Sequence, residues 1–204
     1  MNNNRDVKVS GLELYFLPVT MRVPLKFGPE ITTEVTCARV AMQVENDERR
    51  SAWGWGETPL MAQWFWVSSM PFAERLSRVK EFTLILARAW KDSRIGGHPM
   101  EIGHAFQQEI LPGLLDGYNA KCLEKNPGDE PIPWLAALVC CSAFDIALHD
   151  AYGNFHGLPV YQTYDEPFMN RDLSTFLTAA PRISWSSPGR ARYRRGTWWE
   201  ERTW

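Results

Sequence analysis

The chain has 204 residues, of which 45% are hydrophobic and 23% are charged. This length accommodates one domain with a sizeable core, or one domain and part of another, and the composition is that of a soluble globular protein. The formal net charge of −2 favours no class of partner, but it is unevenly spread: residues 1–180 hold 16 basic and 22 acidic residues, whereas residues 181–204 hold six arginines and two glutamates.

The first residues, MNNNRDVKV, contain no apolar segment of a secretory signal. The four cysteines show neither a C-x-x-C nor a zinc-ligand spacing. Two of them, Cys140 and Cys141, lie inside an apolar segment, where free cysteine behaves as a small hydrophobic residue. We therefore expect a cytoplasmic protein without structural disulfides.

Residues 7–60 predict three antiparallel strands. Residues 7–21 alternate apolar and polar side chains and predict a strand broken near Gly11. Residues 23–33, VPLKFGPEITT, contain two prolines and a glycine and predict a loop. Residues 34–45 alternate again, and SAWGWGE at 51–57 predicts a third strand after a polar turn. Three consecutive strands with short connections form a meander.

The hydrophobic period then changes to that of helices. Residues 71–90 place apolar side chains on one stripe of an amphipathic helix. A break follows at Gly96-Gly97, and residues 100–115 predict a second helix that Pro112 kinks or stops. The polar residues 119–131 predict a loop.

The most apolar stretch begins at Trp134 and predicts a buried helix. Its apolar residues recur every three or four positions as far as Phe155, and Asp145 lies inside the most apolar part, so a core helix is favoured over a membrane span. Gly157 is expected to end the helix, and Pro159 to prevent its resumption. Residues 172–178, DLSTFLT, predict a short strand after a loop.

The end of this helix and the turn after it carry the pattern A-x-D-x-A-L-x-D-x-x-G-x-x-x-G-L-P-V-Y. The pattern is similar to the helix and turn that join the capping domain to the barrel in the mandelate racemase and muconate lactonizing enzyme branch of the enolase superfamily. The matching positions are Ala143, Asp145, Ala147, Leu148, Asp150, Gly153, Gly157, Leu158, Pro159, Val160 and Tyr161.

The order of elements extends the resemblance, because strands followed by helices predict an α+β fold. The resemblance implies a capping domain over residues 1–156, with a three-stranded meander and a helical bundle. It implies a linker and the first strand of a β/α barrel over residues 157–180. The atypical tail, residues 181–204, holds four of the ten tryptophans and no lysine, valine or leucine.

The tail shows no strand or helix period, and a complete barrel needs roughly 250 residues. We interpret the tail as a disordered, aberrant or out-of-frame terminus, so that the catalytic barrel is missing. A nucleic-acid site is the weaker alternative: four arginines between 190 and 195 would meet phosphates while Tyr193 and Trp198 stack on bases. One short basic segment gives only weak, salt-sensitive attraction.

Relatives in this family abstract the proton alpha to a carboxylate, and Mg²⁺ stabilises the resulting enediolate. The resemblance places their Lys-x-Lys motif, acidic metal ligands and His-Asp pair beyond the matched part of this chain. No catalytic residue and no metal ligand is therefore carried over. Mg²⁺ is expected in the intact family but no cofactor in this chain, and a small carboxylate substrate is expected only where a barrel is present.

The two capping loops that close over substrate in this family do have counterparts. The first matches residues 23–33, where Lys26 is placed to meet a carboxylate and Phe27 to wall a pocket. The second matches residues 53–60, where Glu57 and Thr58 lie in a turn. The plainer alternatives are a solvated lysine at position 26 and a glutamate at position 57 that pairs with a neighbour.

Other conspicuous residues have simpler interpretations. Asp145 and His149 are four apart, as metal ligands on a helix are, but a helix-surface pair is favoured because no third ligand is evident. His98 has no evident partner. Trp53 and Trp55 alternate on a strand and are interpreted as core or interface residues.

Two functional hypotheses follow. The first is a truncated mandelate racemase or muconate lactonizing enzyme relative, inactive by itself. The second is a non-catalytic interaction module that forms homo-oligomers through an apolar face that a barrel would otherwise cover. Neither hypothesis involves a membrane, and nucleic acid is a minor third possibility.

Overall fold

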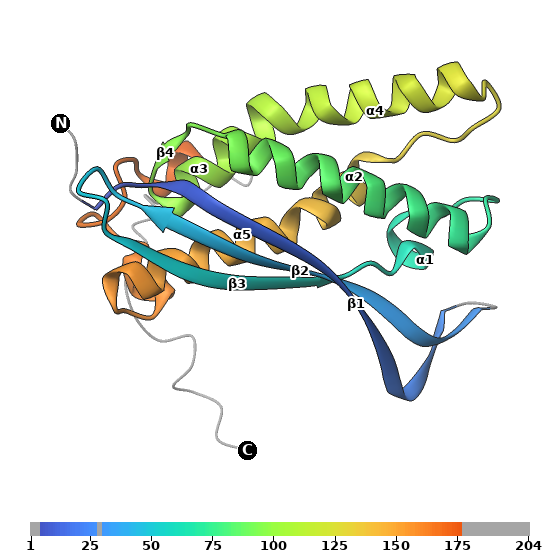
Figure 1. The fold of residues 1–204 in the computed structure, drawn as a ribbon, viewed down its shortest axis with the longest axis horizontal. Helices are drawn as coiled ribbons and strands as arrows, with labels where there is room; N and C mark the ends of the chain where they lie inside the picture. The colour runs from blue at the N-terminus through green and yellow to red at the C-terminus, as the bar shows by residue number, and fades with distance from the viewer. Residues whose placement is uncertain (1–4, 28–29, 177–204) are drawn as a thin grey trace, which may run out of the picture. The chain divides into compact units, whose positions relative to one another are not determined.

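The computed structural model describes residues 5–27 and 30–176, and for Phe27 and Glu30 the backbone alone. Four strands form one antiparallel sheet in the order β3-β2-β1-β4 (Figure 1). Their bounds are β1 Val7–Phe27, β2 Glu30–Glu45, β3 Ser51–Pro59 and β4 Gly96–Gly97. The predicted meander and the α+β class are confirmed. The two-residue β4, which pairs with Val7 and Lys8, was not predicted.

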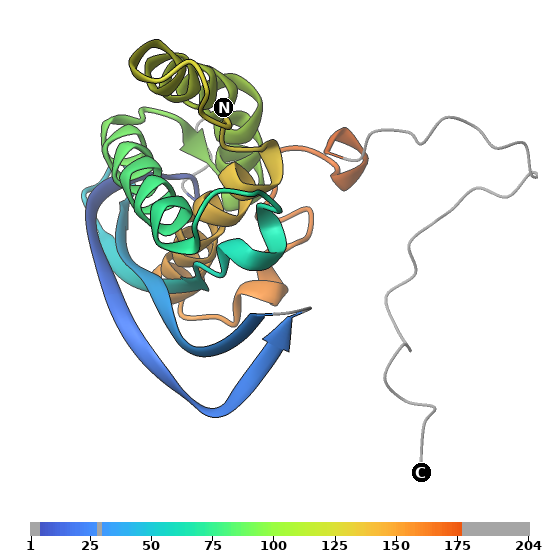
Figure 2. The same ribbon diagram turned by 90° about the vertical axis from the view of Figure 1, so that its right-hand side faces the viewer.

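The predicted loop over residues 23–33 is wrong, because β1 continues to Phe27 and β2 resumes at Glu30. The ladder tolerates Pro24 through a shift of register between Thr20 and Leu25. In this half of β1 the edge opposite β2 has no described partner strand, and proline is accepted at such an edge. The resulting hairpin bends away and extends past the helices (Figures 1 and 2).

The helices lie on one face of the sheet. They are α1 Ala62–Phe65, α2 Phe72–Asp92, α3 Pro99–Ala105, η1 Phe106–Ile110, α4 Leu111–Lys125 and α5 Trp134–His156. The helices predicted over 71–90 and from Trp134 are confirmed. In addition, α5 is long and apolar enough to cross a membrane, but half of its most apolar window is buried in this fold.

The segment after His98 differs from the expectation. Pro112 does not stop the helix, because α4 continues to Lys125 and replaces the first part of the predicted loop over 119–131. The structure accommodates the proline because it falls in the first turn of α4, immediately after the π-helical segment η1. Helical backbone runs from Pro99 through η1 into α4 without a break, and the change to π-helical pairing at Phe106–Ile110 lies directly before this proline, which has no N–H to donate.

The core lies between the inner face of the sheet, α2 and α5. Ala38, Val40, Met42 and Val44 of β2 are fully buried, which confirms the predicted inward face of this strand. Trp90 of α2 stacks on Phe106 with ring centroids 3.9 Å apart, and the ring of Phe144 of α5 lies 6.4 Å from that of Trp90. All six residues of the predicted α5 stripe are buried: Ala137, Cys141, Phe144, Leu148, Ala151 and Phe155.

Beyond α5 the chain forms short helical turns. Gly157 ends the helix in the left-handed conformation, with φ 66°, and a 3-10 helix follows at Val160–Thr163. A strand was expected over residues 172–178, but Leu173–Thr175 form another 3-10 helix. That turn belongs to a second unit beginning at Leu173, whereas the sheet and helices belong to a unit ending at Asp172. The tail over 181–204 lies outside the described residues.

Candidate functional site

The four site residues predicted from sequence are not brought together. Lys26 is exposed near the end of β1, opposite Ile31, and the side chain of Phe27 lies outside the described residues. Glu57 lies on β3, opposite Arg39. Ile31 and Arg39 are eight residues apart on β2, which is roughly 25 Å of extended strand. One small ligand therefore does not reach both Lys26 and Glu57 in this conformation.

Glu57 and Thr58 point to opposite faces of β3, because successive strand side chains alternate. Residues 53–59 are thus strand rather than the predicted turn. On the outer face, Glu57 accepts from Arg39 Nε at 2.6 Å, so the alternative of a paired glutamate is the one observed. On the inner face, Thr58 is 7% exposed and its hydroxyl lies 2.5 Å from that of Ser142 on α5. Thr58 is a core contact.

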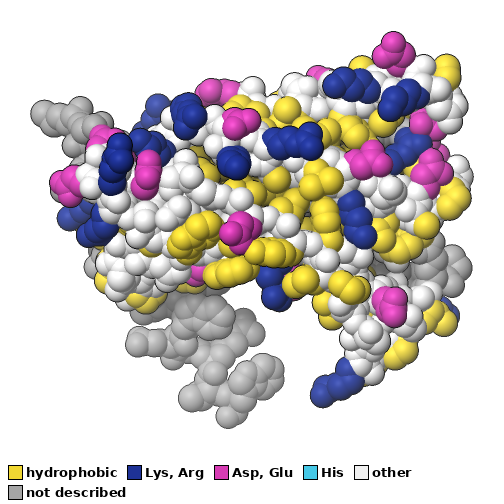
Figure 3. Space-filling model, viewed as in Figure 1, with side chains coloured by type: hydrophobic (Ala, Val, Ile, Leu, Met, Phe, Trp, Pro, Cys, Tyr) yellow, Lys and Arg dark blue, Asp and Glu magenta, His cyan; other side chains and the backbone are white. Residues whose placement is uncertain are grey.

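The outer face of β3 is aromatic, so of the two interpretations of Trp53 and Trp55, core or interface, the core is excluded and the interface stays a prediction. Their side chains are 42% and 53% exposed, and Trp55 stacks on Tyr15 of β1 with centroids 6.4 Å apart. Hydrophobic side chains gather over the strands in the space-filling view (Figure 3). The inner positions of β3 are taken by Gly54 and Gly56 instead, so the tryptophans face outward.

These two glycines allow α5 to lie directly on β3. A Cβ on Gly54 would lie 2.0 Å from the backbone nitrogen of Ala151, and one on Gly56 would lie 2.1 Å from the carbonyl oxygen of Ala143. No side chain fits at such distances. The W-G-W-G alternation is therefore the sequence signal for a helix packed against this strand, and it went unrecognised in the sequence.

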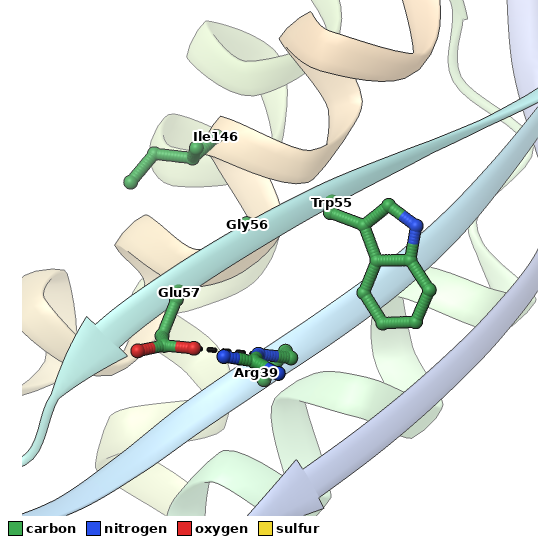
Figure 4. Close-up of a pocket in the computed structure, with 5 residues that line it drawn as sticks. All are labelled: Arg39, Trp55, Gly56, Glu57 and Ile146. Carbon is green, nitrogen blue, oxygen red and sulfur yellow. Dashed lines mark hydrogen bonds and ion pairs between the residues drawn. The ribbon is translucent and has the colours of Figure 1, made fainter.

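A hollow of about 420 Å³ opens where β3 meets α5. Its lining residues are Arg39, Trp55, Gly56, Glu57 and Ile146 (Figure 4). The indole of Trp55 and the Arg39–Glu57 ion pair lie on the sheet side of Gly56, and Ile146 lies on the helix side. Sequence reasoning identified Glu57 and Trp55 but not the hollow, because Arg39 and Ile146 belong to elements far apart in the chain.

The acidic and glycine positions of the family-like pattern have structural roles. Asp150 accepts a hydrogen bond from the backbone N–H of Trp55 at 2.8 Å. A Cβ on Gly103 of α3 would lie 2.4 Å from Asp145, and a Cβ on Gly153 would lie 2.9 Å from the carbonyl oxygen of Leu158. The pattern thus seats α5 against β3 and α3 and admits the turn that follows.

Asp145 and His149 form the predicted i, i+4 pair, with 3.9 Å between Nε2 and Oδ1, but the pair is not confined to the surface. The Nδ1 of His149 lies 2.7 Å from the hydroxyl of Tyr164, and its ring lies against that of His98. Burial raises the pKa of Asp145 and lowers the pKa of His149. The hydrogen bond between His149 and Tyr164 thus links α5 to the segment that follows it.

His98, which had no evident partner in the sequence, is fully buried at the start of α3. Its Nδ1 accepts from the N–H of Met100 at 3.2 Å, and Glu101 accepts from the N–H of His98 at 3.1 Å, which together form a capping box. Burial, together with a smaller effect of the nearby His149, lowers the pKa of His98 to about 4. His98 is a neutral helix cap.

The described residues form no metal centre, and the two adjacent cysteines of α5 are not reactive thiols. Within residues 5–27 and 30–176, no three His, Cys, Asp or Glu side chains gather closely enough to hold an ion, so this part of the chain does not fit the Mg²⁺ site of the family. Burial raises the pKa of both Cys140 and Cys141 to about 12, which keeps them as inert thiols at neutral pH.

No protein-family model and no curated protein matches the chain. Solved structures do. A dipeptide epimerase from Cytophaga hutchinsonii, complexed with Mg and D-Ala-L-Val, is 20% identical over 76% of this chain and 32% of its own, with a TM-score of 0.43. An N-succinyl Arg/Lys racemase from Bacillus cereus is 20% identical over 77% and 33%, with a TM-score of 0.39.

A mandelate racemase/muconate lactonizing enzyme-like protein from Rubrobacter xylanophilus is 18% identical over 76% of this chain and 33% of its own, with a TM-score of 0.37. The chain spans about a third of the length of each of these three proteins.

Proposed function

We propose that this chain is a capping domain of the mandelate racemase and muconate lactonizing enzyme branch of the enolase superfamily. The observation that carries the proposal is the way α5 packs against β3 and against the turn that follows the helix. The pattern that resembles this family places Asp150 against the edge of β3 and Gly153 against the turn at Leu158. A meander followed by helices, in the order that the resemblance implies, supports the same assignment.

In an intact relative, such a domain covers a barrel that binds Mg²⁺ and removes the proton alpha to a small carboxylate, as a racemase, epimerase, cycloisomerase or dehydratase. For this chain we propose the covering role alone, without catalysis. One observation supports an inactive chain: Glu57 and Thr58, which the resemblance places near substrate, are engaged by Arg39 and Ser142.

The test is α-proton exchange in D₂O, followed by proton NMR, with the purified full-length chain and Mg²⁺. Suitable substrates are mandelate, an aldarate and an L-Ala-containing dipeptide. The expected rate equals that of a protein-free sample. Exchange that depends on Mg²⁺ and is abolished by EDTA would overturn the proposal.

The tail gives a second test. If it arises from a change of reading frame, then another frame of the coding DNA beyond codon 180 encodes Lys-x-Lys followed by spaced acidic strands.

A second candidate is the non-catalytic interaction module. It is favoured by apolar side chains exposed around α1 and the first turn of α5, namely Trp64, Val67, Trp134 and Leu135. Light scattering coupled to gel filtration tests it, with the full chain and with residues 1–180. Oligomers of both forms support this module. A monomer at every concentration excludes self-association, and a salt-sensitive gel shift with single-stranded DNA would instead assign the tail to nucleic acid.

A further inference from the structure

The free edge of β3 is closed by α5 along only part of its length. β3 is the last strand of the sheet. Ile146, Asp150 and Asn154 recur every fourth residue on α5, so they form one stripe of that helix. Asp150 accepts from the N–H of Trp55 at 2.8 Å, and Asn154 donates to the C=O of Trp53 at 3.0 Å. These two side chains supply the partners that a neighbouring strand would supply.

The third position of the stripe, Ile146, has no polar group to offer. The backbone groups of alternate strand residues point to the same edge. Because the N–H of Trp55 points to α5, the C=O of Trp55 and the N–H and C=O of Glu57 point to this edge as well. Among the described residues, no hydrogen bond from outside the sheet reaches them. The edge is therefore capped at Trp53–Trp55 and open from the carbonyl of Trp55 onward.

The open part of the edge coincides with the hollow of Figure 4. Trp55 on one side is 53% exposed and Ile146 on the other is 47% exposed. Arg39 and Glu57 neutralise one another through their ion pair. The hollow thus combines two main-chain acceptors, one main-chain donor, two apolar walls and no net charge, and an uncharged extended peptide supplies the complementary groups.

We propose that this open edge binds an extended segment of another polypeptide as an added β-strand. The segment donates a backbone N–H to the C=O of Trp55 and accepts from the N–H of Glu57. Its residue opposite Gly56 places an apolar side chain against Ile146. This interaction surface is separate from the proposed capping role and does not rest on it.

A second copy of this chain is a poorer occupant of the same edge. When two β3 strands pair antiparallel about Gly56, the C=O of Glu57 in one copy faces the N–H of Trp55 in the other. That N–H already donates to Asp150. In addition, Pro59 has no N–H to contribute. A separate peptide faces neither restriction, because it needs to be only as long as the open part of the edge.

The first experiment is amide hydrogen exchange by NMR on the full-length chain, titrated with Ac-Thr-Val-Thr-Val-Thr-Val-Thr-NH₂. Binding is expected to slow exchange at the Glu57 amide by about tenfold or more. The Trp55 amide is expected to change little, because it is already bonded to Asp150. The same peptide N-methylated at alternate amides is the control and is expected not to bind.

The second experiment uses two variants, one beside the open part of the β3 edge and one in the capped part. Ile146→Asn extends the capping stripe and is expected to weaken the heptapeptide by about tenfold or more while the fold is kept. Trp53→Ala removes an aromatic side chain that is 42% exposed, against 47% for Ile146, from the capped part of the edge. This variant is expected to leave the affinity for the heptapeptide unchanged. An equal effect of both variants would contradict the proposal.

Two further outcomes would overturn it. One is the absence of saturable binding up to about 1 mM peptide, where the standard free energy of binding is only about −4 kcal/mol. The other is protection of the Glu57 amide that rises with protein concentration in the absence of peptide, because the edge would then belong to a second copy.

Discussion

The imidazole Nε2 of His98, at the start of α3, lies 3.3 Å from the hydroxyl of Thr163, which follows α5 in the chain. Thr163 in turn donates to the carbonyl of Val160 at 2.6 Å. With Nδ1 accepting from Met100, the neutral ring satisfies both of its nitrogens by donating from Nε2. A proton added at Nδ1 would oppose the N–H of Met100 and remove the cap of α3.

Acid is therefore expected to destabilise the protein through His98. Its pKa is about 4 in the fold, against about 6.5 in the unfolded chain. Between these values the unfolded chain binds the extra proton, so the free energy of unfolding falls as the pH is lowered through this window, by up to about 3 kcal/mol, and the loss is complete below pH 4. Urea unfolding from pH 7 to pH 4 measures the slope.

The variant His98→Asn provides the comparison for that slope. Asparagine caps helices well but does not titrate in this range. His149 and His156 also have lowered pKa values, and Asp145 has a raised one, so some pH dependence is expected to persist. The difference between the two proteins isolates His98. Parallel curves for both proteins would contradict its assignment as the buried neutral cap.

Gly56→Ala is expected to cost more than about 3 kcal/mol of stability or to prevent folding, because the new methyl group meets the backbone of α5 at Ala143. Gly117→Ala is the matched control. A Cβ at Gly117 meets nothing within 4 Å in α4, and alanine is the better helix former, so this change is expected to stabilise by about 0.5–1 kcal/mol. Thermal and urea unfolding measure both. Equal effects would contradict the direct seat of α5 on β3.

Asp150→Ala is expected to lower the free energy of unfolding by about 1–2 kcal/mol, since it leaves the N–H of Trp55 without its charged acceptor. Asp116→Ala, at an exposed position of α4, is expected to change it by less than about 0.5 kcal/mol. Exchange of the Trp55 amide is expected to accelerate in the first variant only. An unchanged amide would show that Asp150 is not its acceptor.

Alkylation distinguishes the cysteines. Cys140 and Cys141 are buried thiols whose pKa is raised to about 12, whereas Cys122 is partly exposed on α4. Iodoacetamide at pH 8 is expected to label Cys122 and to spare the adjacent pair in the native chain, and to label all of them in urea. Peptide mass spectrometry reads the sites. Rapid native labelling of Cys140 would contradict a buried α5.

The sequence was most informative where one side of an element is buried. The alternation in β2 and the three- and four-residue spacing in α5 predicted inward faces that the structure confirms, because both elements pack on one continuous core. The sequence was misleading at Pro112, because the predicted stop does not occur: the helix continues past this residue, directly after a π-helical segment. It also failed at residues 23–33, where prolines indicated a loop but the outer edge of a hairpin accepts them.

The candidate site was less predictable than the fold, for a physical reason. For Glu57, predicted in a substrate loop, the alternative of a paired glutamate is the one observed, but its partner Arg39 lies across a strand pair whose register follows from the whole ladder. The hollow depends on Ile146, which has no polar group to bond to the edge of β3 as Asp150 and Asn154 do. This difference along α5 becomes visible only when the helix is seen beside the strand. Long-range pairing of this kind leaves no local periodic signal.

The long hairpin of β1 and β2 also affects how the protein can change over time. Val23, within the register shift, and Ile31, beyond it, are 68% and 66% exposed and lie away from the packed centre. Substitutions there cost little folding free energy, whereas each position under α5 is held by contacts on several sides. The distal hairpin is thus free to diversify its surface while the remainder of the domain stays constant.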